Sequence, residues 1–161
     1  MRRLRLLRIQ DVTHLCKHLG SSPNELAHLC LKPEWYYRQG PRRIKGKTRH
    51  IATPQGRLRQ ILDRLQALLQ RVVLPESIHG GVKGHSPRTN AVVHLRKPVV
   101  LCMDIKDFFP SITNRRVYAM FRETLKCAPD VARILTRLCT LNGSLPQGSP
   151  TSTIVAALST V

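Results

Sequence analysis

Length, composition and charge narrow the class of protein before any element is assigned. The chain has 161 residues, 42% of them apolar, which fits one globular domain and excludes a disordered chain. It carries 27 lysines and arginines against 9 aspartates and glutamates, a formal net charge of +18. A polyanion such as nucleic acid would neutralise that charge, although a solvated basic surface remains the alternative that charge alone leaves open.

The cysteines and the N-terminus bear on the compartment. Five cysteines lie far apart, without a CxxC pair, which favours a reducing environment. The basic start MRRLRLLRIQ precedes no apolar stretch of signal-peptide length, and no segment is as long as a membrane span. We therefore expect a cytoplasmic protein without membrane contact. The spacing of His14, Cys16 and His18 is unfamiliar for zinc, so we interpret them as ordinary helix residues.

The first third of the chain predicts helices followed by a hairpin. Residues 9–19 and 23–31 read as short helices, the second with Ser22 as N-cap, Pro23 at its first position and Glu25 three residues after the cap. Residues 35–54 are strongly basic, and Gly46 between apolar positions predicts a β-hairpin whose tip presents cations.

Helical periodicity returns after the hairpin. Apolar residues at 58, 61, 62, 65, 68, 69, 72 and 73 predict a helix with one buried face. Residues 75–90 are rich in glycine, proline and serine, and we expect them to be irregular. Further apolar patterns predict helices around 117–125, from Pro129 onward, and after the turn NGSLPQGSPTS.

The apolar run VVLCM ends in an aspartate, and this predicts a buried strand from near Pro98 to Asp104. A strand would hold the backbone of Asp104 while its carboxylate emerges at the edge of a sheet, where oxygen ligands bind divalent cations. A helix N-cap or a surface ion pair is the alternative for a lone aspartate. Asp107, Phe108 and Phe109 follow closely enough to share one pocket with it.

These motifs together resemble one enzyme family. MDIKDFFPSI resembles the first catalytic-aspartate motif of reverse transcriptases, LPQGSPTS resembles their next motif, and IKGKTRHIATP is similar to their fingers segment. NAVVH, residues 90–94, matches the NAxxH element of bacterial retron reverse transcriptases. The resemblance implies an α+β fold with an N-terminal helical element (1–34), fingers with the NAxxH region (35–97) and a partial palm (98–161).

The resemblance also implies roles for individual residues. Asp104 would bind the two catalytic Mg²⁺ ions, with the backbone carbonyl of Ile105 as a further ligand. Phe109 falls at the aromatic position that excludes a ribose 2′-hydroxyl, and Phe108 is expected to pack inward beside it. The residues that we assign to nucleotide binding are Lys47, Arg49, Asp107, Phe108, Phe109, Gln147 and Gly148.

Two groups of these assignments have an open alternative. Lys47 and Arg49 would clamp a triphosphate, but they could equally contact a phosphate backbone. Asn90 and His94 would contact RNA, or they could hydrogen-bond the neighbouring loop from one helix face. The residues assigned to RNA binding are Arg42, Arg43, Lys45, Asn90 and His94.

The implied function is that of a retron-type RNA-directed DNA polymerase, which uses dNTPs to copy a structured noncoding RNA into DNA. Alternatives are a group II intron or phage-defence reverse transcriptase, and a noncatalytic RNA-binding protein. The chain departs from the family because it contains no Tyr-x-Asp-Asp turn and no Asp-Asp pair. We therefore expect an N-terminal portion whose catalysis requires a second polypeptide with further carboxylates.

Overall fold

The structure, a computed structural model, describes residues 8–44, 46–82 and 84–160. It is mainly helical with one small sheet, and this mixed content is compatible with the expected α+β class. The elements are α1 (Val12–Leu19), α2 (Pro23–Leu31), a 3₁₀ turn η1 (Pro33–Tyr36), β1 (Tyr37–Ile44), β2 (Lys47–Pro54), α3 (Gly56–Leu69), α4 (Pro87–Val92), α5 (Phe108–Ser111), α6 (Asn114–Ala119), the π-helical η2 (Met120–Thr124), α7 (Pro129–Cys139) and α8 (Ser152–Leu158).

Both predicted N-terminal helices are present; α2 begins at Pro23 as predicted, whereas α1 begins at Val12 and not at residue 9. The Ser22 hydroxyl accepts the backbone N–H of Glu25 at 3.2 Å, and Pro23 is the first residue of α2. Asp11 caps α1 in the same way, because its carboxylate accepts the N–H of His14 at 2.7 Å. Gly20 ends α1 with a φ of 58°, a left-handed conformation that glycine adopts without strain.

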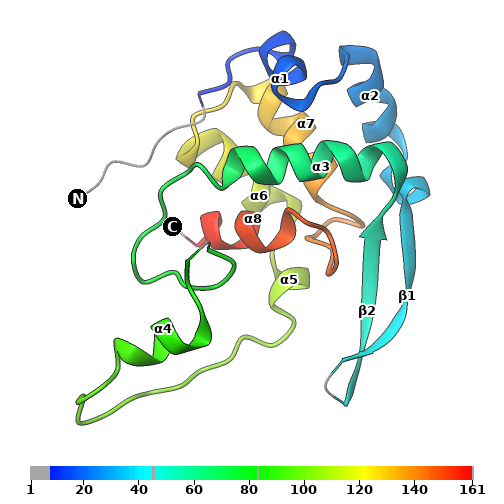
Figure 1. Cartoon of the computed structure of the whole chain (residues 1–161). Coiled ribbons are helices and arrows are strands. Elements are labelled where there is room, and N and C mark those ends of the chain that lie inside the picture. Colours follow the sequence, from blue (N-terminus) through cyan, green and yellow to red (C-terminus); the bar gives the residue numbers. More distant parts are fainter. Residues whose placement is uncertain (1–7, 45, 83, 161) are drawn as a thin grey trace.

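The helix α3 organises the core. Leu58, Ile61, Leu62, Leu65 and Leu69 on one face of α3 are buried, which confirms the predicted amphipathic helix. That face packs against α1, α7 and α8, and Figure 1 shows α3 crossing the molecule between α1 and α8. Burial of each such side chain contributes roughly 1.5–3 kcal/mol, so this helix stabilises the fold substantially.

An ion pair fastens the α1–α2 connection to the start of α3. Arg57 Nε donates to Glu25 Oε1 at 2.7 Å, and Arg57 Nη2 donates to the carbonyl oxygen of Gly20 at 2.6 Å. The hydroxyl of Ser21 also donates to the Glu25 carboxylate. The guanidinium and this hydroxyl stabilise the charged carboxylate, and they lower the pKa of Glu25 to about 2.

Residues 37–54 form the predicted hairpin. β1 and β2 pair in an antiparallel register that ends with Ile44 opposite Lys47, and Gly46 lies in the turn before β2. Gly46 there has a φ of 78°, in the left-handed region. The base of the hairpin enters the core through Tyr37 and Ala52, which are buried, and its far end projects from the helical body (Figure 1). Lys45, assigned to RNA binding, lies outside the described residues.

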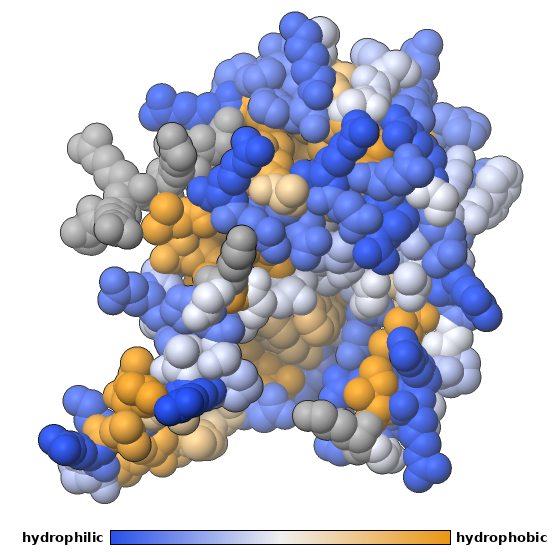
Figure 2. Space-filling model, viewed as in Figure 1, coloured by the Kyte–Doolittle hydropathy of each residue, from blue (hydrophilic) through white to orange (hydrophobic). Residues whose placement is uncertain are grey.

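The prediction of a buried strand ending at Asp104 is wrong. Residues 99–105 have no regular secondary structure and are exposed: Val99 is 82% exposed, Leu101 78% and Met103 86%. A strand needs a neighbour for its backbone N–H and carbonyl groups, and the described residues offer this segment none. Together with α4 it forms an arm beside the helical body, and Figure 2 shows apolar residues gathered on this arm.

The remaining helices mostly follow the predicted pattern. The helix expected around 117–125 is α-helical only to Ala119 and then continues as the π-helix η2, while α7 and α8 begin at Pro129 and Ser152. The irregular segment predicted for 75–90 ends early, because α4 starts at Pro87. Among the described residues, no helix combines the length and apolar character needed to cross a membrane.

The exposure of the arm can be measured through its cysteine. Cys102 is exposed, whereas the other four cysteines are buried, and burial raises the pKa of Cys30 to about 11 and that of Cys139 to about 12. Because the thiolate is the reactive form, we expect one rapidly modified thiol in the native protein and five after denaturation, measured by titration with a chromogenic disulfide. Cys102→Ser should remove the rapid phase. A native protein without a rapid thiol would mean that residues 99–105 are buried.

The Glu25–Arg57 pair predicts a pH-dependent contribution to stability. The pKa of Glu25 is about 2 in the folded protein, below its ordinary value of 4.5, so the stabilisation is complete above about pH 4.5 and is lost as the pH falls toward 2. Glu25→Gln should therefore lower the melting temperature at pH 7, and the difference from the unsubstituted protein should shrink below pH 4.5. Glu34→Gln is the matched control. A difference that stays constant down to pH 3 would contradict the assignment.

Candidate active site

A cavity of about 750 Å³ lies between the β1–β2 hairpin and the segments around α5. Three parts of the chain line it: the hairpin, the stretch from Asp104 to Pro110, and the turn from Leu141 to Gln147. Figure 2 shows the surface hollowed between the hairpin and the arm. The cavity therefore brings together the three sequence motifs that lie far apart along the chain.

The turn that carries Gln147 is held at three points. Leu145 N–H donates to the carbonyl oxygen of Ile112 at 3.1 Å, and the buried Ser152 hydroxyl donates to that of Pro146 at 2.6 Å. The N–H of Ala52 in β2 donates to the carbonyl oxygen of Gln147 at 2.8 Å. These bonds connect the turn to the start of α8 and to the hairpin, so the position of Gln147 is fixed relative to β2.

Gly148 makes this close approach possible. A Cβ atom there would lie 2.7 Å from Ile51 Cγ2 and 2.9 Å from the carbonyl oxygen of Ala52, and φ is 120°. Any side chain would push the turn away from β2 and strain the backbone. We expected Gly148 to line the nucleotide pocket, but it packs against β2 and is not among the residues that line the cavity.

The two phenylalanines form part of the cavity wall. Phe108 and Phe109 are both half-buried against the core, with ring centroids 5.6 Å apart. Both line the cavity, so Phe108 does not pack wholly inward as expected. Asp107, just before them, has a φ of 50°, which places a non-glycine residue in the left-handed region. Such strained conformations are most often found at functional sites.

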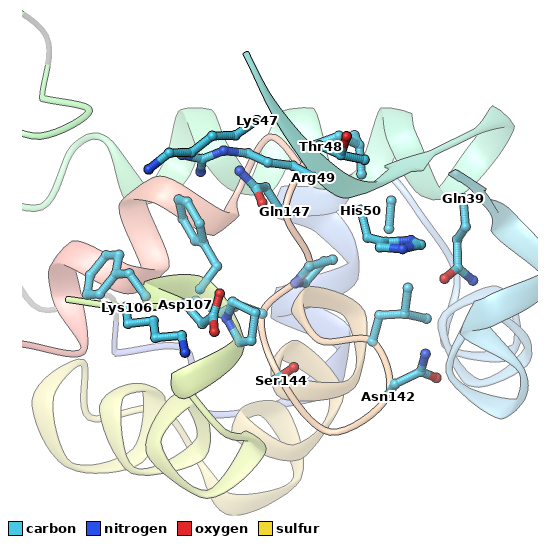
Figure 3. A pocket seen from close by; sticks show the side chains of 18 of the residues that line it. Gln39, Lys47, Thr48, Arg49, His50, Lys106, Asp107, Asn142, Ser144 and Gln147 are labelled. Carbon is cyan, nitrogen blue, oxygen red and sulfur yellow. The ribbon is translucent and has the colours of Figure 1, made fainter. Parts of the chain in front are cut away.

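Charged side chains enter the cavity from two segments of the chain. Figure 3 shows Lys47 and Arg49 reaching from β2, Gln147 close to them, and Lys106 and Asp107 approaching from the segment before α5. Asp104 lines the cavity near Asp107 in the chain and is exposed. The site therefore combines positive groups that could bind phosphates with oxygen ligands that could bind a hard cation.

The oxygen ligands fit magnesium in kind but not in number. Asp104, Asp107 and the backbone of Ile105 supply the hard oxygen atoms that Mg²⁺ prefers. No group of three or more His, Cys, Asp or Glu side chains suitable for a metal occurs within residues 8–44, 46–82 and 84–160. These residues alone would therefore leave a magnesium ion short of ligands, and oxygen atoms from a nucleotide or from other carboxylates would have to complete its coordination.

Several predicted residues lie outside the cavity. Asn90 is in the last turn of α4 and His94 follows the end of that helix, so the two do not share one helical segment. Arg42 and Arg43 are exposed on β1, where Arg42 stands directly opposite Arg49 in the hairpin register. These residues are available for contacts on the surface but do not line the cavity.

Other lining residues were missed by the motif reasoning: Gln39, Thr48, His50, Lys106, Asn142 and Ser144. Gln39, Thr48 and His50 belong to the hairpin, and Lys106 lies directly before Asp107. Asn142 and Ser144 belong to a tight turn in which Leu141 and Ser144 pair, and Asn142 and Gly143 both have positive φ. The Asn-Gly pair is a sequence signal for such a turn, but it does not reveal which cavity the turn faces.

Comparison with known proteins gives a consistent result. No family model matches the chain. The chain is 36% identical over 113 residues to the retron Se72 reverse transcriptase of Salmonella heidelberg (strain 579083-10), a match that covers 70% of this chain and 30% of that protein. It is 36% identical over 118 residues to the retron Ec86 reverse transcriptase of Escherichia coli, covering 73% and 34%.

A third relative extends the match along nearly the whole chain. The retron Ec48 reverse transcriptase of Escherichia coli is 27% identical over 165 aligned residues, which cover 93% of this chain and 40% of that protein. The chain thus spans about a third of the length of the curated relatives it matches. The similarity agrees with the motifs that meet in the cavity, and the chain belongs to the family of retron reverse transcriptases.

Proposed function

We propose that the cavity between the hairpin and α5 binds a deoxynucleoside triphosphate with Mg²⁺, as part of a retron-type RNA-directed DNA polymerase. In this proposal residues 35–97 serve as fingers and residues 98–161 contribute part of the palm. The observation that carries it is the meeting of Asp104, Phe109 and Gln147 with Arg49 in one cavity. The names of the relatives support an RNA template and a DNA product in general terms.

The basic side of the cavity suits the triphosphate. Lys47 and Arg49 alternate with Thr48 along β2 and therefore point to the same face, the face on which Ile51 approaches Gly148. A guanidinium donates two parallel hydrogen bonds to phosphate oxygens, which a lysine cannot do. We assign Arg49 to a fixed phosphate contact and Lys47, nearer the tip of the hairpin, to a more adaptable one.

The acidic side suits the metal and the reacting end of the nucleotide. Asp104 and the Ile105 carbonyl would hold Mg²⁺, which supplies charge neutralisation for the attacking 3′-hydroxyl and the departing pyrophosphate. The ring of Phe109 would restrict the sugar, and Gln147 would contact the nucleotide from a turn that is fixed to β2. The described carboxylates are too few for two ions, so other carboxylates must complete the site.

The arm could bind the segment that supplies the missing carboxylates of the proposed magnesium site. Residues 99–103 are apolar, and the segment 99–105 is exposed and unpaired among the described residues, so its backbone groups can accept a neighbouring strand. We propose that residues 99–105 become a β-strand when a further segment, which carries the missing carboxylates, pairs beside them. That segment can belong to a second polypeptide, and its pairing would bring carboxylates next to Asp104.

The residues assigned to RNA binding lie on exposed surfaces outside the cavity, where they could contact a structured noncoding RNA: Arg42, Arg43, Asn90 and His94. We assign Asn90 and His94 to RNA contacts because both residues are exposed. A net charge of +18 makes such binding strongly dependent on salt.

The first test concerns nucleotide binding by the chain itself. The probe is dTTP with Mn²⁺, a paramagnetic substitute for Mg²⁺, and binding is followed by broadening of backbone amide resonances. We expect broadening at residues 104–110 and at Gln147, and Asp104→Asn should weaken it by about tenfold because one charged ligand is lost. Asp63→Asn, an exposed carboxylate on α3, is the control. Broadening that is equal in both variants would remove Asp104 from the metal site.

The second test concerns DNA synthesis. The part of this chain that aligns with the Ec86 reverse transcriptase over 118 residues replaces the matching segment of that protein, and extension of a primed RNA template is measured. Loss of a metal ligand removes several kcal/mol of transition-state stabilisation, so Asp104→Asn should reduce synthesis at least about a thousandfold while RNA affinity is unchanged.

Two outcomes of this second test would contradict the proposal. Full activity of the Asp104→Asn chimaera would remove the aspartate from catalysis and favour a noncatalytic RNA-binding protein. DNA synthesis by the 161-residue chain alone, with the same template, dNTPs and Mg²⁺, would contradict the requirement for further carboxylates. Asp63→Asn again serves as the matched substitution, and it should leave synthesis unchanged.

A further inference from the structure

A second cavity, of about 280 Å³, lies between α6 and α7. Its lining residues are Asn114, Arg115, Tyr118, Arg133, Thr136 and Arg137. It shares no lining residue with the first cavity and has well under half its volume. We call it the arginine cavity, because half of its lining residues carry a guanidinium group.

The three arginines carry no compensating charge within the described part of the chain. The ion pairs found there join Glu25 to Arg57 and Asp63 to Arg59, and none involves the arginine cavity. The nearest acid along α7, Asp130, accepts the N–H of Val131 at 2.8 Å. All three arginines are exposed, so their donors can reach a ligand from solvent.

The arrangement is unfavourable for the helices themselves. Arg133 and Arg137 are four residues apart on α7, so they lie on the same face, and like charges at this spacing destabilise a helix. Arg115, on the neighbouring helix α6, adds a third positive charge to the same cavity. An anionic ligand would remove this repulsion, and a guanidinium cluster of this kind is well suited to phosphate oxygens.

The arginine cavity connects structurally to the first cavity. Asn114, which lines the arginine cavity, donates its backbone N–H to the carbonyl oxygen of Gly143 at 2.9 Å. The residues on either side of Gly143, namely Asn142 and Ser144, line the first cavity. This hydrogen bond therefore joins the wall of the arginine cavity to the turn that lines the first cavity.

We propose that the arginine cavity between α6 and α7 binds a phosphate of an RNA backbone. The ligand chemistry, a phosphate group, follows from the three exposed arginines, none of which takes part in the ion pairs found among the described residues. The identification of RNA as its source rests on the proposed function. The site holds and orients the RNA and takes no part in the nucleotidyl transfer, because it lies outside the cavity that contains Asp104.

The test uses the unmodified 161-residue chain and a fluorescent 20-nucleotide oligouridine, with fluorescence anisotropy read over a series of salt concentrations. The double variant Arg133→Gln/Arg137→Gln should bind about tenfold more weakly, equivalent to about 1.4 kcal/mol. Its plot of log affinity against log salt should be less steep by about 0.7, since one phosphate contact on a single strand is lost.

The matched control removes two positive charges elsewhere. Lys17→Gln/Arg71→Gln changes two exposed residues that line neither cavity, and its slope should change by less than half as much. Arg133→Lys/Arg137→Lys keeps the charge but loses the paired donors, so it should keep the slope and lose part of the affinity. Circular dichroism confirms that each variant is folded. Equal effects of the glutamine variant and the control would overturn the proposal.

A second readout separates the sources of phosphate. Side-chain N–H resonances of Arg133 and Arg137 are followed by NMR during titration with the oligouridine or with uridine monophosphate. Shifts at micromolar oligouridine and none at the same concentration of monophosphate support an RNA backbone site. Saturation by the monophosphate alone would mean a small-molecule site and would overturn the assignment to RNA. Neither readout uses dNTPs or Mg²⁺, so failure of the polymerase tests leaves both unchanged.

Discussion

One backbone contact holds the two walls of the candidate active site together. The N–H of Ala52 in β2 donates to the carbonyl oxygen of Gln147, and Gly148 approaches β2 so closely that no side chain can fit. The hairpin would otherwise be anchored only through its base in the core. Because the contact joins residues almost a hundred positions apart, it fixes Arg49 and Gln147 relative to each other. The relative position of these two side-chain-bearing segments is therefore set by the fold itself.

Local signals predicted the parts of the fold that local interactions determine. The Ser22 cap, the hairpin turn at Gly46 and the apolar face of α3 each depend on residues within a few positions of one another, and all three are confirmed. The segment 99–105 is different, because a strand is stable only with a partner that pattern alone does not identify. Its apolar sequence is typical of a buried strand. The described residues supply no strand to pair with it, and the segment is exposed.

The sequence motifs of the candidate site could be predicted, but the way in which the fold brings them together could not. The motif resemblance pointed to Asp104, Phe109 and Gln147, and the structure places these residues around one cavity. Sequence spacing gave no indication that the turn at Asn142 would face the same cavity, or that Gly148 would contact β2. The arginine cavity also arises only from the packing of α6 against α7, because Arg115 and Arg133 look like scattered surface charges in the sequence.

The bare arm has a consequence for how the protein behaves at high concentration. VVLCM is a short, uncharged, β-prone stretch that lies open to solvent, the kind of sequence that seeds cross-β stacking between molecules. Charged residues flank this stretch and oppose such stacking: Lys97 before it, and Asp104 and Lys106 after it. The net charge of +18 also makes the molecules repel one another, which opposes aggregation. Screening by concentrated salt removes that repulsion, so the protein becomes more prone to self-aggregation as the ionic strength rises.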